Sequence, residues 1–149
     1  MSPVSDAARK EMDRLLDEGI QTAARLLEKY GEFIPLAIGL GPDKETVHVQ
    51  SWNGNDHPTS DEVLALLYPA LRQGVLKGDY RAVAIVTDVR IRKRPPDAPQ
   101  DALRVEIEHP DAPPVACFLP YQLQDGKLIP GKPTAQRTEP KVLGVEEQE

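Results

Sequence analysis

The sequence has very little cysteine and few aromatic residues. Cys117 is the one cysteine in 149 residues, which excludes a scaffold held together by disulfides. One Trp, two Phe and four Tyr are the aromatic residues, so the core has to be built mainly from Val, Ile and Leu. No apolar run approaches the roughly 18 residues that a membrane-spanning helix needs. The length fits one globular domain.

Basic residues are also in the minority. The chain has 18 Lys and Arg against 24 Asp and Glu, a formal net charge of -6, whereas nucleic-acid binders present a basic surface. The first residues lack an apolar segment followed by a small-residue cleavage site, so we expect no secretory signal. Together with the lone thiol, this predicts a cytoplasmic protein that binds neither nucleic acid nor a membrane.

The spacing of apolar residues predicts two helices. An apolar stripe at three- and four-residue steps indicates a helix over about residues 5–30, closed by Gly31. Thr59 is placed to cap a second helix that ends near Lys77. Pro69 inside that helix predicts a kink or a break.

The remaining sequence is typical of strands and turns. Alternating apolar and polar residues predict strands at 33–40, 46–52, 80–93, 103–109 and 115–119, and a small hairpin over 123–129. The loops between the later strands are short, which requires antiparallel pairing. We therefore expect an α+β fold: a two-layer sandwich of about five or six mostly antiparallel strands, with both helices on one face. This single domain spans residues 1–130, and the charged, proline-containing residues 131–149 are expected to form a mobile tail.

Two helices can cover one face of such a sheet. We expect the covered face to include Val83, Ile85, Val105 and Ile107, because burying these side chains decides the register. The other face then holds small and aromatic residues, which on an uncovered sheet are typical of an interface between two copies. We therefore predict a homodimer whose interface includes Trp52, Ala82, Ala84, Val86 and Phe118.

Few side chains are spaced for catalysis or metal binding. Cys117 and His109 fall on neighbouring predicted strands of the apolar face, and we interpret both as core residues rather than as a nucleophile and its base. The three histidines lack a metal-binding spacing, and no second cysteine joins them. We assign no catalytic, cofactor-binding or metal-binding residue.

Two segments could contact a ligand or a partner. The loop over 52–58 precedes a capped helix, where backbone N–H groups point outward, although an ordinary strand-to-helix connection is the alternative. The run from Arg90 to Arg94 has four basic residues in five, and we favour a solvated strand end that meets Glu106 and Glu108 over a phosphate or acidic-partner site. The predicted ligand or partner contacts are Asp56, His57, Arg90 and Arg92.

Three short motifs resemble those of a family of small bacterial proteins of unknown function. They are Leu27-Glu-Lys-Tyr-Gly-Glu-Phe-Ile-Pro-Leu-Ala37, Asp101-Ala-Leu-Arg-Val-Glu-Ile-Glu-His109 and Leu119-Pro-Tyr121. The likeness covers about residues 20–125, and this chain adds a proline-rich loop and a long tail. The resemblance implies a compact, dimeric α/β sandwich and carries no activity.

Two functions stay open at this point. The first is a non-enzymatic, dimeric protein-interaction module, immunity-like or chaperone-like, that engages an unidentified protein partner. The second is a small-ligand-binding protein or an enzyme that uses the 52–58 loop. A cavity with two or more convergent polar side chains would favour the second, and a flat sheet buried against a second copy would favour the first.

Overall fold

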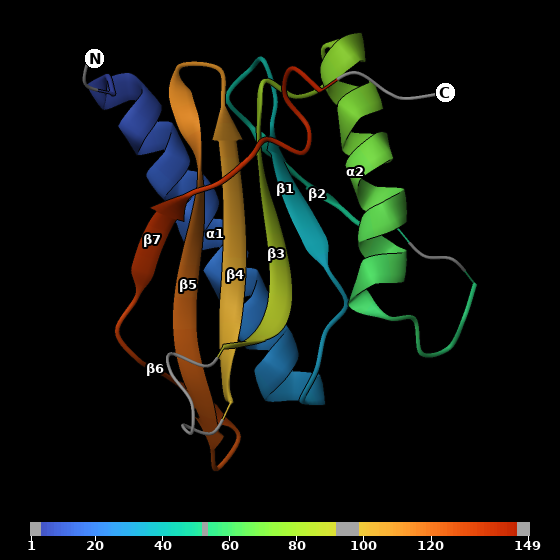
Figure 1. Ribbon diagram of the computed structural model, residues 1–149, viewed down its shortest axis with the longest axis vertical. Coiled ribbons are helices and arrows are strands. Elements are labelled where there is room, and N and C mark those ends of the chain that lie inside the picture. The colour runs from blue at the N-terminus through green and yellow to red at the C-terminus, as the bar shows by residue number, and fades with distance from the viewer. Residues whose placement is uncertain (1–3, 52–53, 92–98, 146–149) are drawn as a thin grey trace.

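The computed structural model describes residues 4–51, 54–91 and 99–145 (Figure 1). In these residues, two helices and seven strands follow one another: α1 (Asp6–Tyr30), β1 (Leu36–Leu40), β2 (Thr46–Val49), α2 (Ser60–Lys77), β3 (Ala82–Ile91), β4 (Gln100–His109), β5 (Ala112–Gln124), β6 (Lys127–Pro130) and β7 (Thr134–Arg137). The strand pairs are antiparallel, so the predicted α+β class is confirmed. Neither described helix combines the length and the apolarity that a membrane span requires.

Both helices begin and end as their sequences predict. The side chains of Ser5 and Thr59 each accept a hydrogen bond from a backbone N–H of the following turn, at 3.1 Å. These N–H groups have no partner within the helix, so the caps satisfy them. Gly31 and Gly78 adopt left-handed backbone angles, with φ of 80° and 84°, and end the two helices.

Pro69 does not interrupt α2, so the predicted alternative of a break is wrong. The helix is continuous from Ser60 to Lys77. A proline at this position removes the N–H that would bond the carbonyl of Ala65. Ala65 lies on the exposed side of the helix, where water can hydrate that carbonyl.

The strands form one sheet in the order β2-β1-β3-β4-β5-β6, and β7 pairs with the first half of β5. β1 and β2, which correspond to the strands predicted at 33–40 and 46–52, pair with each other as a hairpin. Asp125 and Gly126, with φ of 51° and 75°, turn β5 back into β6, which confirms the small hairpin expected there. The long strands β3, β4 and β5 make up the centre of the molecule.

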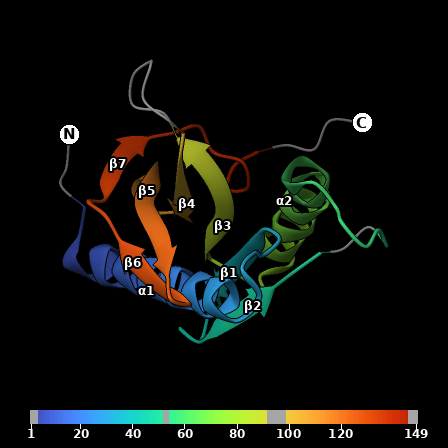
Figure 2. The same cartoon turned by 90° about the horizontal axis from the view of Figure 1, so that it is seen from below.

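The two helices lie on opposite faces of the sheet, which corrects the prediction that both cover one face (Figure 2). α1 packs against Ala84 and Val86 of β3, whereas α2 packs against Val83 and Ile85 of the same strand. Successive side chains of a strand point to opposite faces, so the two helices stand on different sides of β3. Because this strand is apolar on both faces, alternation along it could not say which residues a helix would cover.

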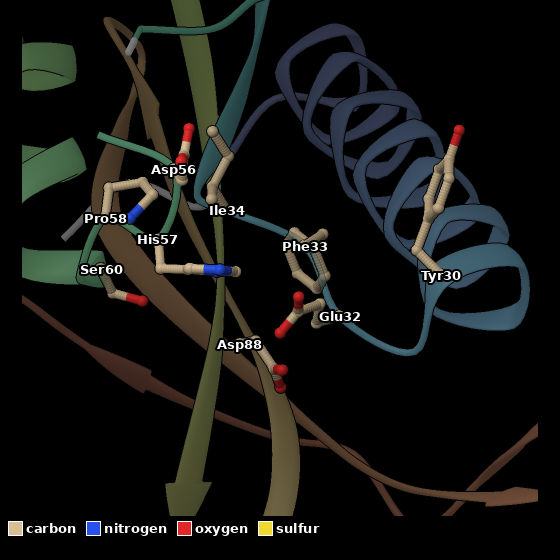
Figure 3. Close-up of a pocket in the computed structure, with 9 residues that line it drawn as sticks. All are labelled: Tyr30, Glu32, Phe33, Ile34, Asp56, His57, Pro58, Ser60 and Asp88. Atoms are coloured by element: carbon tan, nitrogen blue, oxygen red, sulfur yellow. The ribbon is translucent and has the colours of Figure 1, made fainter. Parts of the chain in front are cut away.

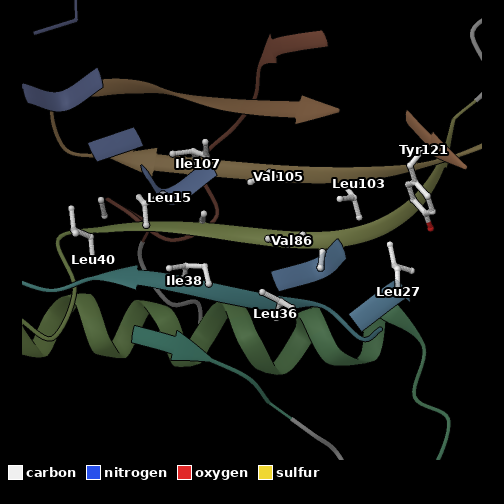
Figure 4. Close-up of a cluster of buried hydrophobic side chains, with 13 residues drawn as sticks. Leu15, Leu27, Leu36, Ile38, Leu40, Val86, Leu103, Val105, Ile107 and Tyr121 are labelled. Atoms are coloured by element: carbon white, nitrogen blue, oxygen red, sulfur yellow. The ribbon is translucent and has the colours of Figure 1, made fainter. Parts of the chain in front are cut away.

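Three residues expected on an open face form the floor beneath α1 instead. Ala82, Ala84 and Val86 are fully buried in a cluster with Leu15 of α1 (Figure 4), so the prediction that they lie on an open face is wrong. A Cβ atom on Gly19 of α1 would lie 2.9 Å from Val86 Cγ2. Small residues therefore mark the close approach of a helix here, and not a surface free for a second copy.

The charge pairs between β3 and β4 also differ from those predicted. Glu106 and Glu108 are buried opposite apolar residues of β3 and do not meet basic side chains of that strand. Arg90 lies opposite Asp101, and the two pair at 3.5 Å. Arg92 lies outside the described residues.

The chain packs against the domain as far as residue 145, although we expected the domain to end at residue 130 and a mobile tail to follow; residues 146–149 of that tail lie outside the described residues. After β7, residues 138–145, which we name the C-terminal strap, cross the face of the sheet that carries α2 (Figure 1). The buried carboxylate of Glu108 accepts hydrogen bonds from the backbone N–H groups of Lys141, Val142 and Leu143 at 2.8, 3.1 and 2.8 Å. The Val142 side chain joins the core beside α2. The domain thus extends to residue 145.

Candidate functional site

A pocket of about 480 Å³ lies where the chain passes from α1 into β1 (Figure 3). Its walls come from the connection between α1 and β1, the loop before α2, and β3. The lining residues are Tyr30, Glu32, Phe33, Ile34, Asp56, His57, Pro58, Ser60 and Asp88. Segments far apart in the sequence therefore bring several polar side chains to one cavity, which we name the acidic pocket.

The acidic pocket exists because β3 extends beyond α1 and β1. α1 ends at Tyr30, and β1 begins at Leu36, directly opposite Val86 of β3. β3 continues for five more residues, Thr87–Ile91, which pair with β4 alone among the described strands. Asp88 stands in this stretch, on the face that α1 covers further along the sheet.

Asp88 is a half-buried carboxylate with a buried partner. Its Oδ1 accepts a hydrogen bond of 2.7 Å from the Tyr121 hydroxyl of β5. Burial raises the pKa of Asp88 above its ordinary value, although the Tyr121 hydrogen bond acts against this. Burial and the neighbouring carboxylate raise the pKa of Tyr121 as well, which keeps its hydroxyl a donor. The acidic pocket therefore presents a poorly solvated carboxylate that a cation would stabilise.

The loop before α2 supplies the opposite wall. Asp56 and His57 are exposed residues of this loop, and Ser60 begins α2. In Figure 3, the His57 ring points toward Phe33, and the Glu32 carboxylate points toward Asp88. Acidic and aromatic groups thus border the same space.

The balance of charge in the acidic pocket is negative. Three carboxylates line it, and no Lys or Arg lines it among the residues that the structure describes. Arg90 follows Asp88 by two residues, but it pairs with Asp101 and is not a lining residue. Carboxylates beside an aromatic ring suit an ammonium or guanidinium group on an apolar stem, since the ring attracts a cation and the stem packs on apolar walls.

The outcome for the predicted contacts is mixed. Asp56 and His57 both line the acidic pocket, whereas Arg90 does not. Trp52 and Arg92 lie outside the described residues. Phe118, expected at an interface, is half-buried on β5 opposite Arg104 and is not among the lining residues of the acidic pocket.

Sequence reasoning missed Glu32, Phe33 and Asp88. The first two belong to the motif on which the family resemblance partly depends, but that resemblance assigns them no role. Asp88 is the one acidic residue within the apolar strand 82–91. A charge inside such a strand was the signal that could have marked it.

His109 is held in a buried network away from the acidic pocket. Its Nε2 lies 2.8 Å from Oε1 of Glu11, which also accepts two hydrogen bonds from Arg81 at 2.8 and 2.9 Å. The backbone N–H of Asp111 donates to Nδ1 at 3.0 Å, so we assign the ring proton to Nε2. The network ties α1 to the central strands and accounts for the histidine structurally.

Cys117 is not positioned to act with His109. It lies opposite Val105 on β4, four residues from His109 and so about 13 Å along the strand. It lines a small, mostly apolar cavity between α1, β5 and β7, and burial raises the pKa of its thiol. Cys117 is partly buried and packs against the core beneath α1, which favours the structural interpretation over a nucleophile.

A second polar cluster lies on the face of the sheet that carries α2. Tyr68 of α2 donates a hydrogen bond of 2.8 Å to Oε1 of Glu106, and Nη2 of Arg104 lies 3.6 Å from the same oxygen. Burial, with Glu106 beside it, raises the pKa of Tyr68. Oγ1 of Thr87 and Nε of Arg104 are buried without a hydrogen-bond partner. This cluster helps to hold α2 on the sheet.

Comparisons with known proteins find no relative. Neither a family model, nor a curated protein, nor a solved structure matches the chain. The family resemblance therefore stays a prediction. Among the residues that the structure describes, no group of three or more His, Cys, Asp and Glu is arranged to hold a metal ion.

Proposed function

We propose that the protein is a non-enzymatic binding module whose acidic pocket takes a positively charged group, an ammonium or a guanidinium. The half-buried Asp88 carries this proposal, because its carboxylate faces the cavity while Tyr121 binds one of its oxygens. A buried charge is unfavourable unless it is paired. A cationic ligand would supply the missing charge.

The other residues of the acidic pocket support this ligand class. Glu32 and Asp56 add negative charge, and Phe33 and Pro58 offer apolar surface to the stem of a lysine- or arginine-like group. The same chemistry serves a free small molecule or a side chain of a partner protein. A protein-interaction module therefore stays compatible with this site, although not through Ala82, Ala84 and Val86, which are buried.

The proposal is tested with N-acetyl-arginine methylamide as the probe. We expect saturable binding to the wild type by NMR titration, with shifts confined to residues around the acidic pocket. Asp88→Asn keeps an acceptor for Tyr121 but removes the charge, so it should weaken binding at least about tenfold. Asp79→Asn, in the turn before β3, makes the same charge change outside the acidic pocket and should leave binding unchanged. Equal binding by wild type and Asp88→Asn would reject the proposal.

A further inference from the structure

The acidic pocket lies along an edge of the sheet that ends abruptly. β1 pairs with Ala82–Val86 of β3 and no further, while β4 pairs with β3 as far as Ile91. The stretch Thr87–Ile91 thus has a strand partner on one side only among the described residues. Its length is about 16 Å, room for five residues of another strand.

At an unpaired strand edge, backbone N–H and C=O groups point outward without a strand partner. Along a strand, every second residue points these groups to the same edge. Thr87 is 2% exposed, so the accessible part of this edge is Asp88–Ile91, which offers about two residues whose backbone groups can bind an added strand. Beside this edge, Figure 3 places Phe33 and Ile34 on one side of the acidic pocket and Asp88 on the other. The space that a prolonged β1 would occupy along β3 is thus next to the pocket.

We propose that an extended segment of a partner protein adds as a strand to the Thr87–Ile91 edge of β3 and places a Lys or Arg side chain in the acidic pocket. This inference rests on the proposed function, because the same cationic group binds in the acidic pocket and is now assigned to a side chain of the partner's strand. Strand addition is an established mode of peptide recognition, in which the backbone supplies affinity and alternate side chains supply specificity.

Charge complementarity determines the kind of occupant. The three carboxylates of the acidic pocket select a basic residue at one position of the added strand. A second copy of this chain is disfavoured, because each copy carries a formal net charge of -6. Asp88 also explains how this edge stays free of unspecific pairing, since a charged residue beside an edge hinders strands that bring no compensating charge.

The experiment compares the binding of a short extended peptide with the binding of its central arginine alone. The two probes are the blocked pentapeptide Ac-Thr-Val-Arg-Val-Thr-NH2 and N-acetyl-arginine methylamide, each titrated into the wild-type protein by calorimetry and NMR. We expect the pentapeptide to bind about tenfold or more tightly, because two or three backbone hydrogen bonds are added. The amide resonances of Arg90 and Ile91, which are not lining residues of the acidic pocket, should shift with the pentapeptide and not with the single residue.

Two methylated pentapeptides provide the matched control. The first peptide carries a methyl group on the backbone nitrogen of the arginine, and the second carries it on the backbone nitrogen of the next valine. In an antiparallel strand, the backbone N–H groups of consecutive residues point to opposite sides, so one methylated nitrogen faces β3 and the other faces away. One of the two should lose the tenfold gain and the other should keep it.

The outcomes separate this inference from the proposed function. If the pentapeptide binds no better than the single arginine, or if both methylated peptides bind like the parent, strand addition is wrong while the cation site stands. If neither probe binds, both proposals fail. If Asp88→Asn weakens the two probes equally and one methylated peptide alone loses affinity, both are supported.

Discussion

At the scale of single residues, two threonines differ in whether the side-chain hydroxyl has a hydrogen-bond partner. Thr59 caps α2 with its hydroxyl, which accepts a hydrogen bond from the backbone N–H of Glu62. Thr87 is 2% exposed, and its hydroxyl is buried without a partner. The same chemical change at the two positions should therefore have opposite effects.

Thr87→Val should raise the free energy of unfolding by about 1 kcal/mol, because it replaces an unpaired buried hydroxyl with a methyl group of similar size. Thr59→Val should lower that free energy by about 1 kcal/mol, because an N-cap is lost. Urea unfolding of both variants measures the two changes. A loss of stability in Thr87→Val would show that its hydroxyl is hydrogen-bonded in solution.

The ionisation of Asp88 should lower the stability of the folded protein as the pH rises. Burial raises its pKa in the folded state, so between the unfolded value, about 4, and the folded value the folded state binds more protons. Stability then falls as pH rises through this window. Asp88→Asn should consequently gain stability relative to the wild type as pH rises from about 4 toward neutrality.

Unfolding midpoints of the wild type and Asp88→Asn, measured across this pH range, check the difference between the two proteins. Asp79→Asn is the control, because its side chain lies outside the acidic pocket. If Asp88→Asn is the less stable protein at neutral pH, the carboxylate is better solvated than its burial indicates. A residue that lowers the stability of the folded state is expected where that residue serves binding.

At the scale of elements, Tyr80 joins α2 to β1. A Cβ atom on Gly39 of β1 would lie 2.4 Å from the Tyr80 ring, and one on Gly74 of α2 would lie 2.2 Å from it. Real Cβ atoms do not come so close to ring atoms, so both glycines are needed where the ring fits between the helix and the strand.

Gly74→Ala should lower the free energy of unfolding by about 1–3 kcal/mol through overpacking, although alanine favours a helix by about 1 kcal/mol over glycine. Thermal and urea unfolding measure the loss. In the double variant Gly74→Ala with Tyr80→Ala, the two losses should be less than additive. Full additivity would mean that the ring does not oppose the new methyl group.

The elements themselves were largely predictable, and their faces were not. Caps such as Thr59 and Gly31, and the turn at Asp125 and Gly126, act through local backbone chemistry, which is readable from a few adjacent residues. The sequence does not show which face of β3 a helix covers, because its apolar residues point both ways. Small residues such as Ala84 are typical of an open sheet face, although here they permit the close approach of α1.

At the scale of the whole molecule, the C-terminal strap closes the face that α2 leaves partly uncovered. Glu108 is 2% exposed, and three backbone N–H groups of the strap bind its carboxylate. Arg72 of α2 donates a further hydrogen bond of 2.8 Å to the Lys141 carbonyl. The strap therefore links the helix, the sheet and the end of the chain.

A chain truncated after Arg137 should lose about 3 kcal/mol of stability, because Glu108 would lose its three backbone donors and the Val142 side chain would be removed from the core. Truncation after Val145 keeps the strap and should leave the unfolding midpoint unchanged. Adding Glu108→Gln to the shorter chain should recover part of the loss, since the unpaired charge is gone. Equal stability of the two truncated chains would contradict this role of the strap.

By itself, the sequence determined the helices, the hairpins, the antiparallel sheet and the α+β class, because these follow from apolar spacing and from caps and turns within a few residues. It also indicated Asp56 and His57, which line the acidic pocket. The tertiary structure alone decided that α1 and α2 lie on opposite faces, that the strap packs on Glu108, and that Asp88 lines the acidic pocket while Tyr121 donates a hydrogen bond to it. These features depend on which distant segments pack together, and with β1 and β3 apolar on both faces, local periodicity leaves that choice open.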